Sequence, residues 1–300
     1  MEQKIIPNLW FDGAKEAVDF YLSAFPDSKL GFTSYYPNSP EEGLQEFQRE
    51  FAGKELTIDF TLGDLKLTAI NAGPMFKFNP SISFMVNFDP SRDEKALEHL
   101  DELWSNLMDG GEAIMPIGEY PYSKRYGWVK DKYGLTWQLI LTDPEGEPRP
   151  FIIPSLLFSG KNVNRAEEAI SYYLSVFKNA KLGAEPARYG EATGPAKAES
   201  IMFADLMLEG QWFAMMDSGE ENDFTFNEAV SLLVACKDQA EIDYYWEKLS
   251  AVPEAEQCGW CVDKFGVSWQ INPVNIEELM KRPGAFAKLM DMKKIVIDDF

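Results

Sequence analysis

The sequence predicts an α+β protein built from two similar halves, each containing two strand–helix–strands modules. The first observation is a segment that occurs twice, as GWVKDKYGLTWQ at 127–138 and as GWCVDKFGVSWQ at 259–270. The second is the match between EAVDFYLSAF at 16–25 and EAISYYLSVF at 168–177. Chance does not place so many identical residues at equal spacings twice, so the chain is a duplication.

Each half begins with a short apolar strand, at 5–11 and at 152–158, that leads into an amphipathic helix. Apolar residues recur along one stripe of each helix with the helical period. We expect Asp12 to cap the first helix, and Asn164 to cap the second in a capping box with Glu167.

Further strands and helices follow at corresponding places in the two halves. Hairpins are expected across Gly-containing turns, pairing 56–62 with 65–71 and 201–208 with 211–217. Second strand-helix units are expected to begin with the strands at 82–88 and 230–236. The repeated segments then close each half.

The closing segment is interpreted as a strand, an Asp-Lys-aromatic-Gly turn and a second strand. In that second strand Gln138 alternates with Trp137, so the two side chains face opposite sides of a sheet. We expect Trp137 and Trp269 to pack the sheet against a helix. A glutamine among apolar neighbours needs hydrogen-bond partners, so Gln138 and Gln270 predict a polar cavity or ligand.

The length of 300 residues suits two domains of about 150 residues. We expect a first domain at 1–145, a linker at 146–150 that is rich in proline and charge, and a second domain at 151–300. The second domain ends in a helical tail from about residue 276, which is expected to dock on the second half or to lie across both.

The charge and cysteine content exclude several classes of function. A net charge of −21 repels phosphate backbones, so nucleic acid is a poor partner. No apolar run approaches the roughly 18 residues of a membrane span, and the start lacks a signal-like apolar core. Three cysteines do not form a secreted disulfide framework, so we expect a cytoplasmic protein. Cys258 and Cys261 form a C-x-x-C in a strand-turn-strand, where we expect no redox role.

The repeated modules resemble the vicinal oxygen chelate superfamily of glyoxalase, bleomycin-resistance and extradiol-dioxygenase relatives. IIPNLWFDGAKEAVDFYLSAF at 5–25, FNEA at 226–229 and GWCVDKFGVSWQ at 259–270 are similar to its PhnB-like branch, which is also named after demethylubiquinone methyltransferase. The resemblance implies that each half folds its two modules into a cup of curved sheet. One chain then corresponds to a dimer of single-copy relatives, and we expect a monomer of this kind or a homodimer.

In metal-using members of that superfamily, histidines and glutamates hold a divalent ion at the floor of the cup. The corresponding positions here carry neither imidazole nor carboxylate; they fall at Pro7 or Asn8, Pro154 or Ser155, Ser81, Ala229, Gln138 and Gln270. The one histidine, His99, is expected on a helix and cannot complete a two-histidine site. We therefore predict no metal in either cup. The chain also lacks a glycine-rich phosphate loop, and we predict no other cofactor.

Several neutral and acidic side chains are candidates for a ligand site. Hydrogen bonding to a small polar ligand, or a purely structural role, is expected of Asn8, Ser81, Gln138, Ser155 and Gln270. Trp128 and Trp260 either stack on a ligand or pack in the core. Asp217 and Glu228 supply a carboxylate or general base, or are turn residues at the ends of strands.

Three functions remain open from the sequence. The protein binds a small organic molecule without metal in one or both cups, as bleomycin-resistance relatives do. Alternatively, it is an enzyme of the superfamily, of isomerase, lyase or dioxygenase type, with an unusual site. In the third interpretation one cup is degenerate and the duplication serves assembly.

Overall fold

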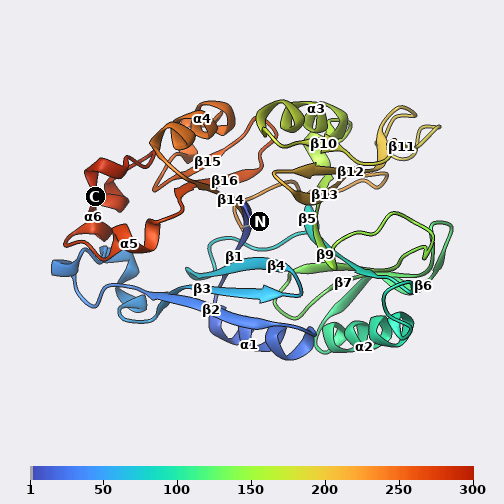
Figure 1. The fold of residues 1–300 in the computed structure, drawn as a ribbon, viewed down its shortest axis with the longest axis horizontal. Coiled ribbons are helices and arrows are strands. Elements are labelled where there is room, and N and C mark those ends of the chain that lie inside the picture. Colours follow the sequence, from blue (N-terminus) through green and yellow to red (C-terminus); the bar gives the residue numbers. More distant parts are fainter. Residues whose placement is uncertain (1–2) are drawn as a thin grey trace.

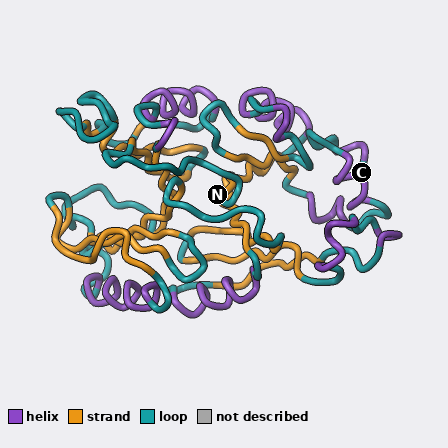
Figure 2. Tube along the Cα trace, turned by 180° about the vertical axis from the view of Figure 1, so that it is seen from behind, coloured by secondary structure: helices purple, strands orange, loops and turns teal. Residues whose placement is uncertain are grey.

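Two curved β-sheets, one of seven and one of nine strands, form the centre of the computed structural model, which describes residues 3–300. The long helices α1 to α4 cover the outer faces of the sheets, whereas the concave faces lie on the sides away from these helices (Figure 1). The view from behind shows the same layers, with short helices near the C-terminus closing one end of the molecule (Figure 2).

The elements follow the predicted order of four modules. The first module contains β1 (Ile5–Phe11), α1 (Ala14–Ala24), β2 (Lys29–Tyr35), β3 (Glu55–Leu62) and β4 (Leu65–Asn71). The second contains β5 (Ile82–Phe88), α2 (Ala96–Met108), β6 (Glu112–Tyr120), β7 (Ser123–Lys130) and β8 (Thr136–Leu141). The third contains β9 (Ile152–Phe158), α3 (Ala166–Val176), β10 (Lys181–Leu182), β11 (Ala187–Arg188), β12 (Ile201–Leu208) and β13 (Gln211–Asp217). The fourth contains β14 (Val230–Cys236), α4 (Gln239–Leu249), β15 (Trp260–Val262) and β16 (Ser268–Pro273), and the tail adds α5 (Ile276–Met280) and α6 (Ala285–Asp291).

The two modules that share a sheet come from different halves of the chain. The seven-stranded sheet has the order β15-β16-β14-β1-β4-β3-β2, and the nine-stranded sheet has the order β10-β12-β13-β9-β5-β8-β7-β6, with β11 paired to β12. Antiparallel pairs join the halves, with Asn8 opposite Ser231 and Ser83 opposite Ser155. The α+β fold with two modules per curved sheet is confirmed, but the expectation that each half forms its own cup is wrong.

A short connection between β8 and β9 lies where this exchange occurs. Only the segment 142–151 separates the two strands, and it leaves β9 paired to β5 within the sheet that already contains β8. The sequence pattern does not specify this choice: a cup within one half would pair β1 with β5 and β9 with β14, whereas the structure pairs β1 with β14 and β5 with β9. Each concave face is consequently shared between the halves, which lie at the bottom and at the top of Figure 1.

Aromatic side chains join the two modules inside each half. Trp137 is fully buried, and its ring centroid lies 5.5 Å from Tyr21 and 4.7 Å from Phe25 on or next to α1. Trp269 packs in the same way on Tyr173, at 5.7 Å. The prediction that these tryptophans pack sheet against helix is therefore confirmed.

Asp131 of the repeated segment ties this core together. One carboxylate oxygen, Oδ2, accepts hydrogen bonds from the Tyr21 hydroxyl and the Trp137 indole N–H, both at 2.8 Å. The other, Oδ1, accepts from the backbone N–H groups of Tyr133 and Leu135. Burial raises the pKa of Asp131, although these four donors favour its ionised form. The segment thus fastens a helix of one module to the closing turn of the next.

Asp263 makes the matching set of bonds in the second half. Its Oδ2 accepts from Tyr173 at 2.6 Å and from Trp269 at 2.9 Å, and its Oδ1 accepts from two backbone N–H groups. The glycines of the two turns, Gly134 and Gly266, have φ of +90° and +89°, a conformation that side chains disfavour. The similarity of the two repeats is therefore a requirement of the core.

The predicted helix caps are wrong. Gly13 occupies the N-cap position of α1 without a side-chain cap, and Asn164 lies before the N-cap of α3 and bonds to Ser200 instead. Side chains from the neighbouring strands serve the helix starts: Asn71 Oδ1 accepts from Gly13 N at 3.4 Å, and Asp217 Oδ1 accepts from Ala166 N at 3.2 Å. Local sequence does not reveal a cap supplied from 50 or more residues away.

Among residues 3–300 no helix is long and apolar enough to cross a membrane.

Candidate functional site

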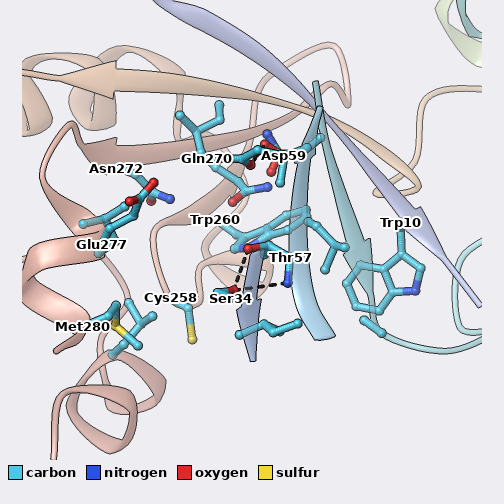
Figure 3. A pocket seen from close by; sticks show the side chains of 18 of the residues that line it. Trp10, Ser34, Thr57, Asp59, Cys258, Trp260, Gln270, Asn272, Glu277 and Met280 are labelled. Atoms are coloured by element: carbon cyan, nitrogen blue, oxygen red, sulfur yellow. Dashed lines mark hydrogen bonds between the residues drawn. The ribbon is translucent and has the colours of Figure 1, made fainter. Parts of the chain in front are cut away.

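A cavity of about 1730 Å³ lies between the halves, on the concave face of the seven-stranded sheet. We call this face and its cavity the open cup. Its floor is supplied by strands of both halves, and Figure 3 shows Asp59 from β3 and Gln270 from β16 projecting into it. Helices α5 and α6 line one end.

Polar side chains at the floor form short local networks. Gln270 Nε2 donates to Ser231 Oγ at 3.0 Å, and Asn8 Nδ2 donates to the backbone oxygen of Ile6 at 3.0 Å. Thr68 Oγ1 donates to Asp59 Oδ1 at 2.7 Å. Burial raises the pKa of the half-buried Asp59, which the Thr68 bond and the charge of Lys66 oppose more weakly. These groups offer donors and acceptors to a molecule in the cavity.

Aromatic and apolar side chains form the walls. The rings of Trp10 and Trp260 meet edge to face at 6.2 Å, and Phe76 meets Trp10 at 4.9 Å. The indole N–H of Trp10 donates to Gly73 O at 2.8 Å, which fixes the ring. Such walls suit an apolar, flat body better than a strongly hydrated one.

The C-terminal tail lies across both halves, which was one of the two expected placements. Phe286 of α6 is buried against Tyr36 and Leu44 of the first half, with Met280 and Met290 packed around them. The tail follows the second half in sequence, so it connects the halves at the end of the open cup. Its helices also line that end of the cavity.

The concave face of the nine-stranded sheet, which we call the filled cup, is occupied by the protein's own side chains. Met85, Ile153, Trp212 and Ala214 form a buried cluster there, with Ile140, Phe203 and Met207 packed against it. Gln138 is buried and fully paired: its Oε1 accepts from Tyr126 at 2.7 Å, and its Nε2 donates to Ser83 at 2.8 Å and to Ser155 at 3.4 Å. In this cup the glutamine is a hydrogen-bonded element of the fold.

Arg149 from the linker closes the filled cup. Its Nε and one terminal nitrogen donate to Asp205 Oδ2 at 2.8 and 2.6 Å, and its guanidinium carbon lies 4.0 Å from the Trp212 ring centroid. The side chains of Arg149 and Asp205 are only 13% and 9% exposed, so the ion pair is largely removed from water. The linker, which the sequence shows as rich in proline and charge, therefore contributes a packed side chain.

A family model described as 3-demethylubiquinone-9 3-methyltransferase matches residues 3–140 and 150–272. The chain belongs to this family. The two matched regions cover both halves, which confirms the resemblance to PhnB-like proteins arranged in tandem. No match was found among the curated proteins.

Solved structures of glyoxalase and PhnB proteins are similar to this member of the family. Glyoxalase I from Zea mays is 13% identical, covers 92% of this chain and 94% of its own, and gives a TM-score of 0.55. The PhnB protein from Bacillus cereus is 33% identical, covers 47% of this chain and 100% of its own, with a TM-score of 0.39. Protein PA1353 from Pseudomonas aeruginosa is 21% identical over 47% of this chain and 98% of its own, with a TM-score of 0.38. The maize enzyme shows that the two-sheet fold of this demethylubiquinone methyltransferase family member is glyoxalase-like.

The predicted site residues divide between the two cups. Asn8, Trp260 and Gln270 line the open cup. Gln138 and Ser155 lie in the filled cup, and Trp128 faces the same side as its cross-strand partner Gln138. The sequence places Asn8 and Ser155 correctly on equivalent strands. It does not tell which of the two lines a cavity.

Serines two residues further along the chain take the place expected for Ser81 and Ala229. Ser81 is buried just before β5 and serves the sheet through its backbone, whose oxygen accepts from Leu157 N. Ser83 and Ser231 are the residues that contact the two glutamines. Side chains alternate between the two faces of β5 and β14, so the strand partners of Ser83 and Ser231 would have placed both serines on the same face as the glutamines.

Asp217 and Glu228 do not share a site. Glu228 lines the open cup, whereas Asp217 is buried at the start of α3, where backbone N–H groups of Ala166 and Ile201 bond to its carboxylate. Burial raises the pKa of Asp217. Its engagement with the backbone favours the interpretation as a structural residue at the end of a strand.

Sequence reasoning missed Asp59, its counterpart Asp205 and the linker residue Arg149. A signal was available: both aspartates lie in the middle of a strand between two apolar residues, as IDF at 58–60 and ADL at 204–206. An acidic residue inside a half-buried strand needs a partner. Comparing the two hairpins position by position identifies the pair.

The side chains of the open cup do not fit the divalent ion that glyoxalase-like relatives suggest. Within the described residues, no group of three or more His, Cys, Asp or Glu side chains is arranged to hold a metal. The floor instead offers amides and hydroxyls from Asn8, Ser231 and Gln270, which are weak ligands for Zn²⁺ or Ni²⁺ beside imidazole. The absence of a bound metal in solution stays a prediction.

Proposed function

We propose that this protein binds a small organic molecule, without a metal, in the open cup alone. The observation that supports this most directly is the difference between the two cups. Equivalent concave faces carry a cavity of about 1730 Å³ in one sheet and a packed cluster around Met85 and Trp212 in the other. If both cups served only to stabilise the fold, we would expect side chains to fill both of them.

The size and lining of the cavity limit the ligand. Pockets for small molecules measure roughly 300–1,000 Å³, so this cavity suits an extended or multi-ring molecule. Trp10, Trp260 and Phe76 offer apolar ring faces and edges, and Asn8 and Gln270 offer amides. The ligand therefore combines a flat apolar body with a few polar groups.

The filled cup serves assembly in this proposal. Its cluster and the Arg149–Asp205 pair join the third module and the linker to the second module. One degenerate cup, an alternative that the sequence left open, is thus compatible with ligand binding in the other.

We do not extend the methyl transfer named in the family description to this chain. Transfer of a methyl group requires a donor, and no strand of the sequence leads into a glycine-rich phosphate loop. The proposal of binding requires only the groups that line the cavity.

A thermal-shift screen of metabolites, with the Gln270→Ala and Gln138→Ala variants as a matched pair, tests the proposal. A ligand of the open cup raises the melting temperature of the wild type by mass action, with or without EDTA. Q270A should weaken that stabilisation, whereas Q138A should lower the melting temperature of the free protein and retain the ligand-induced shift.

A different pattern would contradict the proposal. Stabilisation that requires added Ni²⁺, Zn²⁺ or Mn²⁺ would show a metal site. Stabilisation that is lost only in Q138A would place the ligand in the filled cup. If no compound in a broad screen stabilises the wild type, the binding function itself is wrong.

A further inference from the structure

We infer that the ligand of the open cup carries a planar cation, of guanidinium or amidinium type, that pairs with Asp59. This inference rests on the proposed function and names the chemistry that the site selects. The inference is drawn from the filled cup, where the guanidinium of Arg149 occupies the equivalent position.

Asp59 and Asp205 occupy equivalent positions in the two sheets. In the seven-stranded sheet, Thr68 pairs with both Asn8 and Asp59; in the nine-stranded sheet, Ala214 pairs with both Ser155 and Asp205. Since Asn8 and Ser155 are themselves equivalent, the registers place the two aspartates at the same point of each concave face.

A glycine lies against each aspartate and supports this equivalence. A Cβ atom added to Gly31 would lie 3.0 Å from Asp59 Cβ, and one added to Gly183 would lie 2.0 Å from Asp205 Oδ1. A Cβ at Gly183 would require Asp205 to shift, and a Cβ at Gly31 would lie closer to Asp59 than most Cβ contacts in proteins. The two halves thus keep the same close approach beside the carboxylate.

Asp205 shows what this position binds. The Arg149 guanidinium pairs with one carboxylate oxygen through two N–H groups and lies over the Trp212 ring, a planar cation held between an acid and an aromatic face. Arg149 belongs to the linker, so the cation enters the filled cup from outside the sheet, as a ligand would. Guanidinium groups are well suited to this combination of pairing and stacking.

Asp59 has the same carboxylate without the arginine. Across residues 3–300, its one side-chain partner is Thr68, and no lysine or arginine nitrogen forms an ion pair with it. The residue that corresponds to Arg149 before the first strand is Glu2, which lies outside the described residues and carries the wrong charge. A half-buried carboxylate that lines a cavity is therefore available to a cation from solution.

The immediate surroundings favour a cation with an apolar body. Lys66 of β4 also lines the cavity, at the register position that Trp212 holds in the filled cup, but its side chain is exposed and forms no ion pair in the described part of the chain. Phe32 follows Gly31 and lines the cavity, and Trp10 and Trp260 extend the apolar wall. A cationic group at Asp59 thus leaves the rest of the molecule on aromatic side chains.

Calorimetric titration with benzamidine, benzamide and benzoate tests the charge requirement directly. The three probes share a planar ring and differ in charge, so the comparison on the wild type needs no variant. We expect benzamidine to bind roughly tenfold or more tightly than benzamide, as a charge-assisted hydrogen bond in a partly buried site implies, and benzoate to bind most weakly. Asp59→Asn should remove the advantage of benzamidine, while Asp64→Asn, at the exposed turn of the same hairpin, should keep it.

The Arg149→Ala variant provides a second measurement. Without the guanidinium, Asp205 and Trp212 form a second vacant subsite, so benzamidine should bind once to the wild type and twice to R149A. The double variant R149A/D205N should return to one equivalent. This increase depends on the filled cup and tests the equivalence of the two aspartates.

Equal binding of benzamidine and benzamide to the wild type would overturn the inference. The same holds if D59N retains the full preference, or if R149A gains no second equivalent while remaining folded. Metabolites found by the thermal-shift screen would then still establish binding in the open cup. A screen without any such compound would instead remove the proposed function.

Discussion

Replacing Asp131 by asparagine tests whether the hydrogen bonds of the repeated segment stabilise the core. The amide oxygen of the new side chain keeps the two backbone bonds that Asp131 Oδ1 accepts from Tyr133 and Leu135. The amide NH₂ takes the place of Oδ2, which accepts from Tyr21 and Trp137 at 2.8 Å. The Tyr21 hydroxyl can turn and accept, but the indole N–H of Trp137 has no such freedom and is left unpaired.

The magnitude follows from these two bonds. A hydrogen bond to a charged group contributes about 1.5–3 kcal/mol, and a buried donor without a partner costs about 1–3 kcal/mol. Removing a buried charge offsets part of this loss, so we expect D131N to lower the free energy of unfolding by about 2–4 kcal/mol. Asp263 makes the same bonds to Tyr173 and Trp269, and D263N should cost a similar amount.

Urea unfolding followed by tryptophan fluorescence measures both variants against the wild type. Asp64→Asn, at an exposed hairpin turn, is the control and should stay within about 0.5 kcal/mol, as surface substitutions generally do. If D131N and D263N also stay within that range, the aspartates do not hold the core. The repeated segment would then have to be explained by the site instead.

Two further predictions concern the open cup and the thiols. Because burial raises the pKa of Asp59, its carboxylate is protonated at higher pH than an ordinary aspartate with a pKa of about 4. Benzamidine affinity should therefore fall as the pH decreases through that raised pKa, while benzamide affinity stays level; a level benzamidine profile would contradict the assignment. In native protein, iodoacetamide should alkylate Cys258 alone, since Cys236 and Cys261 are completely buried and burial raises the pKa of both thiols. Mass spectrometry of the alkylated protein locates the label, and a reversible Cys258–Cys261 disulfide would reopen the redox interpretation.

The sequence predicts the strands, the helices and their duplication because these depend on local periodicity and turn residues. The glycine-containing turn after Asp131 and the apolar stripe around Tyr21 are visible in the residues themselves. The pairing of modules into sheets is not visible, because the residues do not tell whether β1 pairs with β5 of its own half or with β14 of the other half. That pairing brings together strands that are far apart in the sequence, so local residue patterns do not encode it.

The candidate site was predictable only in part for a related reason. Gln138 and Gln270 are closely similar in sequence context, yet one is fully paired inside a packed cluster and the other lines a cavity. Residues outside the repeat contribute to this difference: Arg149 in the linker packs into one cup, and α5 and α6 in the tail line one end of the other. Repeat comparison identifies what the cups share, but it carries no information about these unique segments.

Because the two copies are joined in one polypeptide, the two cups can differ in sequence. In a dimer of identical subunits, every substitution appears in both hollows at once, and a side chain that blocks one also blocks the other. Here the stretch between β8 and β9 occurs only once, so its arginine reaches a single hollow and leaves the second unaffected. Each hollow can therefore acquire its own role, one as a permanent joint and the other as a receptor.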